Sequence, residues 1–304
     1  MSRRAQGWLW GALGVLAVVV LWVLYKFLGP EQGFVVGAIE GETGSGVMLL
    51  PRTNDRAMPH IWEMVARLFA STSGGDTPPL WVSVASAAGV TLGIAAVGWV
   101  IGVAVGMALA LVMHRFKLAE WGLLPWIVVS QTVPLIAFAP LVASIGSQID
   151  RAGTPFPEWL SVAIIASYLS FFPVAIGALR GLSAPDRNQE DLFRTYGVGW
   201  WPTLMRLRLP AAVPHLLPAL RLAAANAVVG AVVAEVSIGM RGGIGRMLIQ
   251  LAGQGSSDPA AVWGPTFGAV AMGLIAPGPT PSTAAGPRTS RRAEGARGAQ
   301  GNGA

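Results

Sequence analysis

The chain of 304 residues is 53% hydrophobic and only 12% charged, which is too little charge to cover a soluble globule of this size. Its formal net charge of +6 comes from bases beside apolar segments rather than along an amphipathic face, which argues against nucleic acid as a partner. The absence of cysteine excludes disulfides and thiolate metal sites. The histidines, His60, His114 and His215, lack the spacing of a helical metal site. The composition therefore predicts a membrane protein.

Residues 7–28 form the first apolar segment and follow a short basic start at residues 1–4. About 20 helical residues cross a hydrocarbon core of roughly 30 Å, so this segment predicts a membrane span. A signal peptide with cleavage near residues 35–38 is the alternative, but the apolar region exceeds the usual length of about 7–15 residues. The polar segment that follows predicts a short amphipathic helix over residues 58–70, lying at the membrane surface.

Further apolar stretches follow along the chain. They are residues 80–113, 123–145, 159–179, 216–238 and, shorter, 261–276. The first of them is long enough to include an extramembrane turn. Its glycines recur mostly at intervals that allow close helix approach, at Gly89, Gly93, Gly98, Gly102 and Gly106. Together with the first segment these stretches give six candidate spans and predict an all-α polytopic membrane helix bundle.

The chain divides into a span with an extracytoplasmic segment over residues 1–79, a core over residues 80–276 and a tail over residues 277–304. Lys and Arg gather beside alternate span ends, which predicts that both termini are cytoplasmic. The tail is rich in Pro, Gly, Ala and Arg and predicts disorder. Because the last apolar run is short for a span, we hypothesise a frameshift at the end of the gene.

A long polar loop at residues 180–215 predicts a helix, a glycine break and a second helix. Asp186 or Asn188 caps the first helix and Gly197 ends it. The second helix begins near residue 200, and three prolines then interrupt or bend the entry into the next span. These are Pro210, Pro214 and Pro218. Such a loop forms a stiff exposed knob that suits a groove on a partner.

This loop resembles the cytoplasmic loop of the permeases of binding-protein-dependent ABC importers. That family has the pattern Glu-Ala-Ala, three residues, Gly, nine residues, Ile-x-Leu-Pro. The positions that match it in order are Asp191, Leu192, Phe193, Gly197, Leu207, Leu209 and Pro210. The resemblance implies that these residues dock a separate ATPase subunit and that the core has the type I importer permease fold.

Residues 130–140 and 220–235 resemble the nitrate, sulfonate and taurine subgroup, which includes some pyrimidine-precursor importers. This resemblance implies a small solute of one of those types, a second permease copy in a homodimer, and an extracytoplasmic solute-binding protein. The only lysines, Lys26 and Lys117, lack the preceding glycine loop of a phosphate-binding P-loop, so we expect no cofactor on this chain and ATP on the partner.

Polar groups at membrane depth are the candidates for the solute path. They are Gln131, Thr132, Pro134, Asn226 and Glu235. An ionised carboxylate is costly in an apolar span, so Glu235 contacts either the solute, Arg221 or a backbone donor near a helix end. Interhelical hydrogen bonding is the alternative role for the amides and the hydroxyl. Pro134 frees a backbone carbonyl, which hinges the helix or lines the path.

No nucleophile elbow, carboxylate pair or histidine dyad occurs in the sequence, which argues against an enzyme. An ion-coupled secondary transporter is the alternative function. It predicts inverted repeats with matching broken helices and several intramembrane ionisable groups. The sequence contains no such repeat and Glu235 is an isolated acid, so the ABC importer permease is favoured.

Overall fold

The computed structural model describes residues 3–32, 34–36, 47–71 and 78–276. The chain forms two compact units, one of residues 18–278 and one of residues 1–17 with 279–304, and the contacts below lie within the first. The tail at residues 277–304, for which we predicted disorder and a frameshift, lies outside the described residues.

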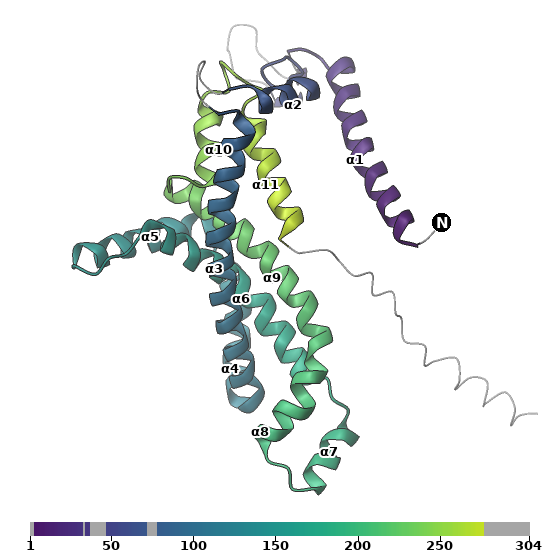
Figure 1. Cartoon of the computed structure of the whole chain (residues 1–304), viewed down its shortest axis with the longest axis vertical. Coiled ribbons are helices and arrows are strands. Elements are labelled where there is room, and N and C mark those ends of the chain that lie inside the picture. The colour runs from purple at the N-terminus through teal and green to yellow at the C-terminus, as the bar shows by residue number, and fades with distance from the viewer. Residues whose placement is uncertain (1–2, 33, 37–46, 72–77, 277–304) are drawn as a thin grey trace, which may run out of the picture. The chain divides into compact units, whose positions relative to one another are not determined.

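Four helices of the described residues are long and apolar enough to cross a membrane (Figure 1). They are α1 (Arg3–Leu28), α3 (Leu80–Arg115), α6 (Glu158–Leu182) and α9 (Leu209–Ile238). A fifth span is possible if α4 (Lys117–Ser130) and α5 (Leu135–Arg151) cross together. The last apolar stretch forms the shorter helix α11 (Trp263–Ile275). The predicted membrane helix bundle is confirmed, with fewer single long helices than the six stretches suggested.

The apolar stretch at residues 80–113 forms one continuous helix, without a chain reversal. It lies in α3, a single helix of 36 residues, and at about 1.5 Å per residue such a helix is about 54 Å long. Because this exceeds a hydrocarbon core of roughly 30 Å, α3 extends beyond the membrane on at least one side.

The stretch at residues 123–145 is not one continuous helix. α4 and α5 are bent by 101° at a short break, and Pro134 stands at the N-cap of α5 with extended backbone dihedrals. A proline disfavours helical geometry at the residue before it and supplies no N–H, which favours a break at this place.

Pro210, Pro214 and Pro218 do not interrupt the entry into the next span, and a bend there stays a prediction. α9 includes all three prolines and is preceded by a π-helical segment, Leu204–Arg208, and by α8 (Trp200–Thr203). Pro210 directly follows the π-helical segment as the second residue of α9.

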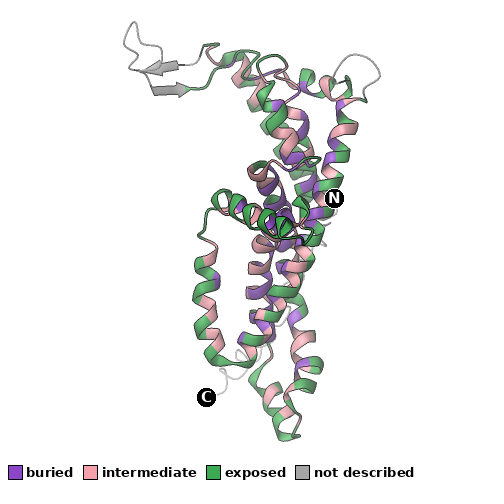
Figure 2. Ribbon diagram, turned by 90° about the vertical axis from the view of Figure 1, so that its left-hand side faces the viewer, coloured by how far each residue is buried: buried purple, intermediate pink, exposed green. Residues whose placement is uncertain are grey.

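Helices α3, α6 and α9 make the most extensive contacts of the bundle, and Figure 2 shows buried residues gathered along these long helices. On α3, Gly98, Gly102 and Gly106 lie directly against α6: a Cβ at Gly98 would be 2.7 Å from the Ala163 carbonyl oxygen, and one at Gly106 2.6 Å from that of Phe171. The predicted close approach is confirmed at these three glycines, which bring the two backbones together. Gly89 and Gly93 have no such neighbour within 4 Å among the described residues.

Two clusters of buried residues hold the bundle together. One joins α3, α6 and α9 to α11 and α10 (Ile244–Gly253), with fully buried Leu80, Ala163 and Ile244. The other lies toward the far ends of α3 and α6 and includes Met113 and Leu182, with Leu204 from the π-helical segment. Since Leu204 directly follows α8, this second cluster connects the loop to the spans.

The segment between α1 and α3 contains a two-stranded antiparallel sheet, β1 (Phe34–Val36) with β2 (Val47–Leu50), and the helix α2 (Ile61–Phe69). α2 buries Met64 and exposes Trp62 and Phe69, so the predicted amphipathic helix is confirmed. Its position at the membrane surface stays a prediction.

Candidate functional site

The polar loop after α6 forms a helix, a glycine turn and a second helix. α7 (Arg187–Thr195) ends at Gly197, which has a φ of +65°. The Gly197 N–H donates to the Arg194 carbonyl at 2.9 Å, and the Val198 N–H donates to the Phe193 carbonyl at 3.0 Å. These two bonds form a Schellman motif, in which the left-handed residue is best supplied by glycine. Asp186 occupies the N-cap of α7, without a side-chain capping bond.

The loop presents an exposed surface with apolar and aromatic side chains. α7 buries none of its residues, and the side chains of Leu192, Tyr196 and Trp201 are 54%, 77% and 60% exposed. Asp191 is also exposed, on the same short helix. Large exposed aromatic and aliphatic groups on a stiff projection are typical of a protein-binding surface.

The matched positions of the loop pattern lie in four structural parts. Asp191, Leu192 and Phe193 belong to α7, Gly197 to the turn, Leu207 to the π-helical segment, and Leu209 and Pro210 to the start of α9. Leu209 packs against the second buried cluster. The exposed Asp191 and Leu192 are therefore available to a partner, whereas the Leu-Pro end anchors the loop to the bundle.

Side-chain contacts that the sequence did not indicate fix the loop to the bundle. Arg208 forms an ion pair with Glu190 of α7, at 3.0 Å between Nη2 and Oε1, and its Nη1 contacts Nε2 of His114 at the end of α3. Close by, the Arg115 guanidinium lies over the Trp200 ring at 5.5 Å. The alternation of acid and base along the loop was the only available signal for the Glu190–Arg208 pair.

Glu235 lies near the end of α9 and is fully buried. Its Oε2 accepts hydrogen bonds from the Thr91 hydroxyl at 3.0 Å and from the Gly245 N–H at 2.8 Å. The Thr91 oxygen in turn accepts from the Ile244 N–H at 2.9 Å. The N–H groups of Ile244 and Gly245, the first two of α10, thus donate hydrogen bonds to side chains of α3 and α9. The Glu235 carboxylate lies at the positive end of the α10 dipole.

The sequence left three partners open for Glu235: the solute, Arg221 or a backbone donor near a helix end. The structure shows the backbone donor, and no hydrogen bond or ion pair joins Arg221 to Glu235. A Cβ at Gly243 would overlap the Glu235 carboxylate, so the chain needs a glycine beside this group. The sequence signal for this arrangement was the glycine-rich run from Gly239 to Gly243. In the structure Gly239 and Gly242 of this run have a positive φ.

The other membrane-depth residues lie mostly at the break between α4 and α5. Gln131 follows α4 and donates to the Ser130 hydroxyl at 3.3 Å, and Thr132 donates to the Val129 carbonyl at 2.8 Å. Asn226 on α9 donates to the Leu169 carbonyl of α6 at 3.3 Å. No hydrogen bond within the described ranges joins these residues to Glu235, so their shared role in a solute path stays a prediction.

An apolar cavity of about 230 Å³ lies between α3, α9 and the end of α11. Its lining residues are Leu92, Ala95, Ala96, Trp99, Ala224, Val228 and Ala276. None of the predicted path residues contributes to it. A cavity without a convergent polar group does not by itself define a solute site.

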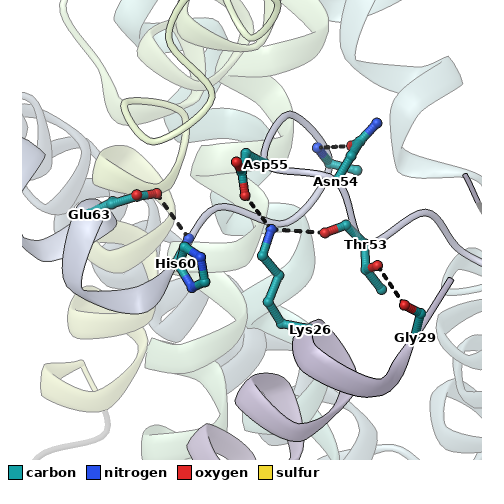
Figure 3. A network of polar contacts seen from close by, with 8 residues as sticks. Lys26, Gly29, Thr53, Asn54, Asp55, His60 and Glu63 are labelled. Carbon is teal, nitrogen blue, oxygen red and sulfur yellow. Dashed lines mark hydrogen bonds and ion pairs between the residues drawn. The ribbon is translucent and has the colours of Figure 1, made fainter. Parts of the chain in front are cut away.

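A polar network ties the end of α1 to the segment before α2 (Figure 3). Lys26 donates to the Thr53 carbonyl at 2.8 Å and pairs with Asp55 at 2.6 Å, while the Thr53 hydroxyl donates to the Gly29 carbonyl at 3.1 Å. Another ion pair, Arg67–Asp258 at 2.6 Å, joins α2 to the chain before α11. These bonds fix the segment between α1 and α3 to the bundle.

The hydrogen bond from Lys26, and next its positive charge, lower the pKa of the Asp55 carboxyl below its ordinary value of 3.8. A lowered folded pKa stabilises the fold above pH 3.8, and this contribution is lost as the pH falls through the folded pKa. We expect Asp55→Asn to lower the thermal unfolding temperature slightly at neutral pH, and not at a pH below the folded pKa of Asp55. Unfolding in detergent, with Glu31→Gln as the control, checks this; an equal difference at both pH values would contradict it.

The fold and the loop together are those of a polytopic membrane protein with an exposed helix-glycine-helix loop between two of its long helices. The family described as binding-protein-dependent transport system inner membrane component matches residues 102–276, and the chain belongs to that family. The family expected from the loop pattern is therefore confirmed, and the description is that of a transport component rather than an enzyme.

Relatives of the chain are described as transport permeases. It is 34% identical over 174 residues to the formylaminopyrimidine transport permease protein ThiX of Halalkalibacterium halodurans, covering 56% of this chain and 65% of the relative. It is 31% identical to the putative aliphatic sulfonates transport permease protein SsuC of Bacillus subtilis, covering 51% and 52%. The chain thus spans less than two thirds of the length of either relative.

A crystal structure of an amino acid ABC transporter with histidines has a similar fold. The TM-score is 0.50 at 20% sequence identity, and the match covers 64% of this chain and 88% of the other. At this identity the likeness concerns the fold alone.

Proposed function

We propose that this chain is the transmembrane permease subunit of an ABC importer, which forms the path for a small solute and couples it to a separate ATPase. The observation that carries the proposal is the loop from α7 to α9. Its glycine turn at Gly197 and its exposed Leu192 and Trp201 lie within the family-matched residues. An exposed, stiff and partly apolar projection supports docking to a groove on another subunit.

Coupling in this proposal is mechanical. This chain binds no nucleotide, and ATP binds to the partner. When two ATPase subunits close on ATP, they move the docked α7 helices and tilt the attached spans between outward-open and inward-open states. Gln131, Thr132, Pro134, Asn226 and Glu235 stay the candidates for residues along the path.

The assembly we propose is a homodimer of this permease in the lipid bilayer, with two ATPase subunits inside and a solute-binding protein outside. Both termini are then cytoplasmic, as the distribution of Lys and Arg favours. The segment between α1 and α2 and the Arg67–Asp258 pair lie on the outer face in this topology.

The proposed solute is of the sulfonate, nitrate or taurine type or a pyrimidine precursor. The names of the relatives, which mention aliphatic sulfonates and formylaminopyrimidine, support this range. Selection among these solutes rests largely on the binding protein in the proposed system.

Co-purification from detergent-solubilised membranes tests the proposed function. The tagged wild-type chain is expected to retain an ATP-hydrolysing subunit, identified by mass spectrometry and by ATP hydrolysis. Asp191→Arg is expected to lose it, because the exposed acid of α7 is reversed in charge. Glu31→Arg, the same change outside the loop, is the control and retains it. A wild-type chain that retains no ATPase would overturn the proposal.

A further inference from the structure

The side chain of Arg208 joins three elements that are far apart in the sequence. It extends from the π-helical segment to Glu190 of α7, at 3.0 Å, and to His114 at the end of α3, 94 residues earlier in the chain. The side chains of Arg208 and Glu190 are only 16% and 27% exposed. An ion pair that is partly withdrawn from water is screened less than one on the open surface.

α7 has few other attachments to the bundle. It buries no residue, and in the part of the chain that the structure describes, Glu190–Arg208 is the one side-chain ion pair or hydrogen bond from α7 to another element. Its remaining support is the Schellman turn and apolar packing around Phe193 and Val198. A force applied to α7 therefore reaches the bundle through Arg208 as well as through the chain on either side of α7.

The residues next to this contact are anchored in the bundle core. Leu204 of the π-helical segment and Met113, adjacent to His114, are both fully buried in the second cluster. α9 begins directly after Arg208, and α3 ends directly after His114, at Arg115. A displacement of Arg208 is thus passed to the ends of two long helices whose side chains are closely packed.

The chemistry of arginine suits this role. Its planar guanidinium presents separate N–H groups to two partners at once, whereas a lysine ammonium is a compact point charge. π-helical segments are rare and occur frequently at functional sites. In the loop pattern Arg208 stands at the unspecified position between Leu207 and Leu209, so the pattern itself gives it no role.

We propose that Arg208 is a positioning residue that transmits the movement of α7 to the inner ends of α3 and α9. This inference rests on the proposed function, in which α7 docks the ATPase. Removing the guanidinium leaves Glu190 without its counter-charge and frees α7 from both helices. The ATPase then still docks on the exposed face of α7, but its closure no longer moves the spans.

The experiment uses the permease-ATPase complex in lipid vesicles. Because the chain has no cysteine, Val112→Cys on the exposed side of α3 provides a single position for an environment-sensitive fluorophore. ATP with vanadate is the probe, so no solute is needed. Arg208→Gln is compared with Arg206→Gln, which removes the same charge from an exposed position of the same segment.

We expect Arg208→Gln to retain the ATPase but to lose the fluorescence change that ATP with vanadate produces in the wild type and in Arg206→Gln. A full change in Arg208→Gln, or loss of ATPase binding in that variant, would overturn the inference alone. If the wild type retains no ATPase, the proposed function on which this inference rests is overturned instead.

Discussion

Glu235→Leu is expected to destabilise the folded protein strongly. The substitution removes the acceptor of the buried Gly245 N–H, and a buried donor left without a partner costs about 1–3 kcal/mol. It also removes the negative group at the N-terminus of α10, which contributes up to about 2 kcal/mol in a buried setting. Thr91 loses a partner as well, although its hydroxyl also lies 3.1 Å from the Ala87 carbonyl. The measurement is thermal unfolding in detergent followed by tryptophan fluorescence.

Glu235→Gln is the matched control, because its amide oxygen keeps an acceptor for both donors at nearly the same volume. We expect it to retain most of the stability that the leucine variant loses. Equal losses in the two variants would mean that the charge matters rather than the acceptor. A folded Glu235→Gln protein that fails to transport would support the prediction that the carboxylate takes part in the solute path.

Gly102→Leu is expected to prevent close packing of α3 against α6. A Cβ at Gly102 would overlap the Ser170 side chain and lie 2.9 Å from the Ser167 carbonyl oxygen. Because this neighbour is backbone, the helices must separate, and overpacking of this kind costs typically about 1–3 kcal/mol. The yield of monodisperse protein in detergent and its unfolding temperature should both fall.

Gly93→Leu makes the same change on the same helix where no described atom lies within 4 Å of the added Cβ. It controls for the altered helix propensity and hydrophobicity of the substitution. If both variants lose stability equally, the close approach of α3 and α6 is not what Gly102 contributes.

The docking loop could be predicted from the sequence because its structure is local. The left-handed turn at Gly197 needs only a glycine after a short helix, and its two backbone bonds join residues a few positions apart. The Glu190–Arg208 pair is less local, and its contact with His114 joins residues 94 positions apart. No pattern within the loop indicates that second partner.

The break between α4 and α5 illustrates a different limit. Hydropathy reports how apolar a stretch is, and residues 123–145 pass that test as one span, but a bend of 101° depends on backbone geometry around Pro134. The continuity of α9 through three prolines is the opposite case. There the packed helix is retained despite residues that usually interrupt one.

The sequence by itself determined that the chain lies in a membrane, that its spans are helical and that a glycine-broken loop projects between two of them. These properties follow from composition, run length and local turn chemistry. Only the tertiary structure decided which groups meet. Glu235 meets Thr91, which lies 144 residues earlier, and the α10 N-terminus, because helix packing brings α3, α9 and α10 together. Such contacts depend on the relative placement of whole helices, which the spacing of residues along the chain does not record.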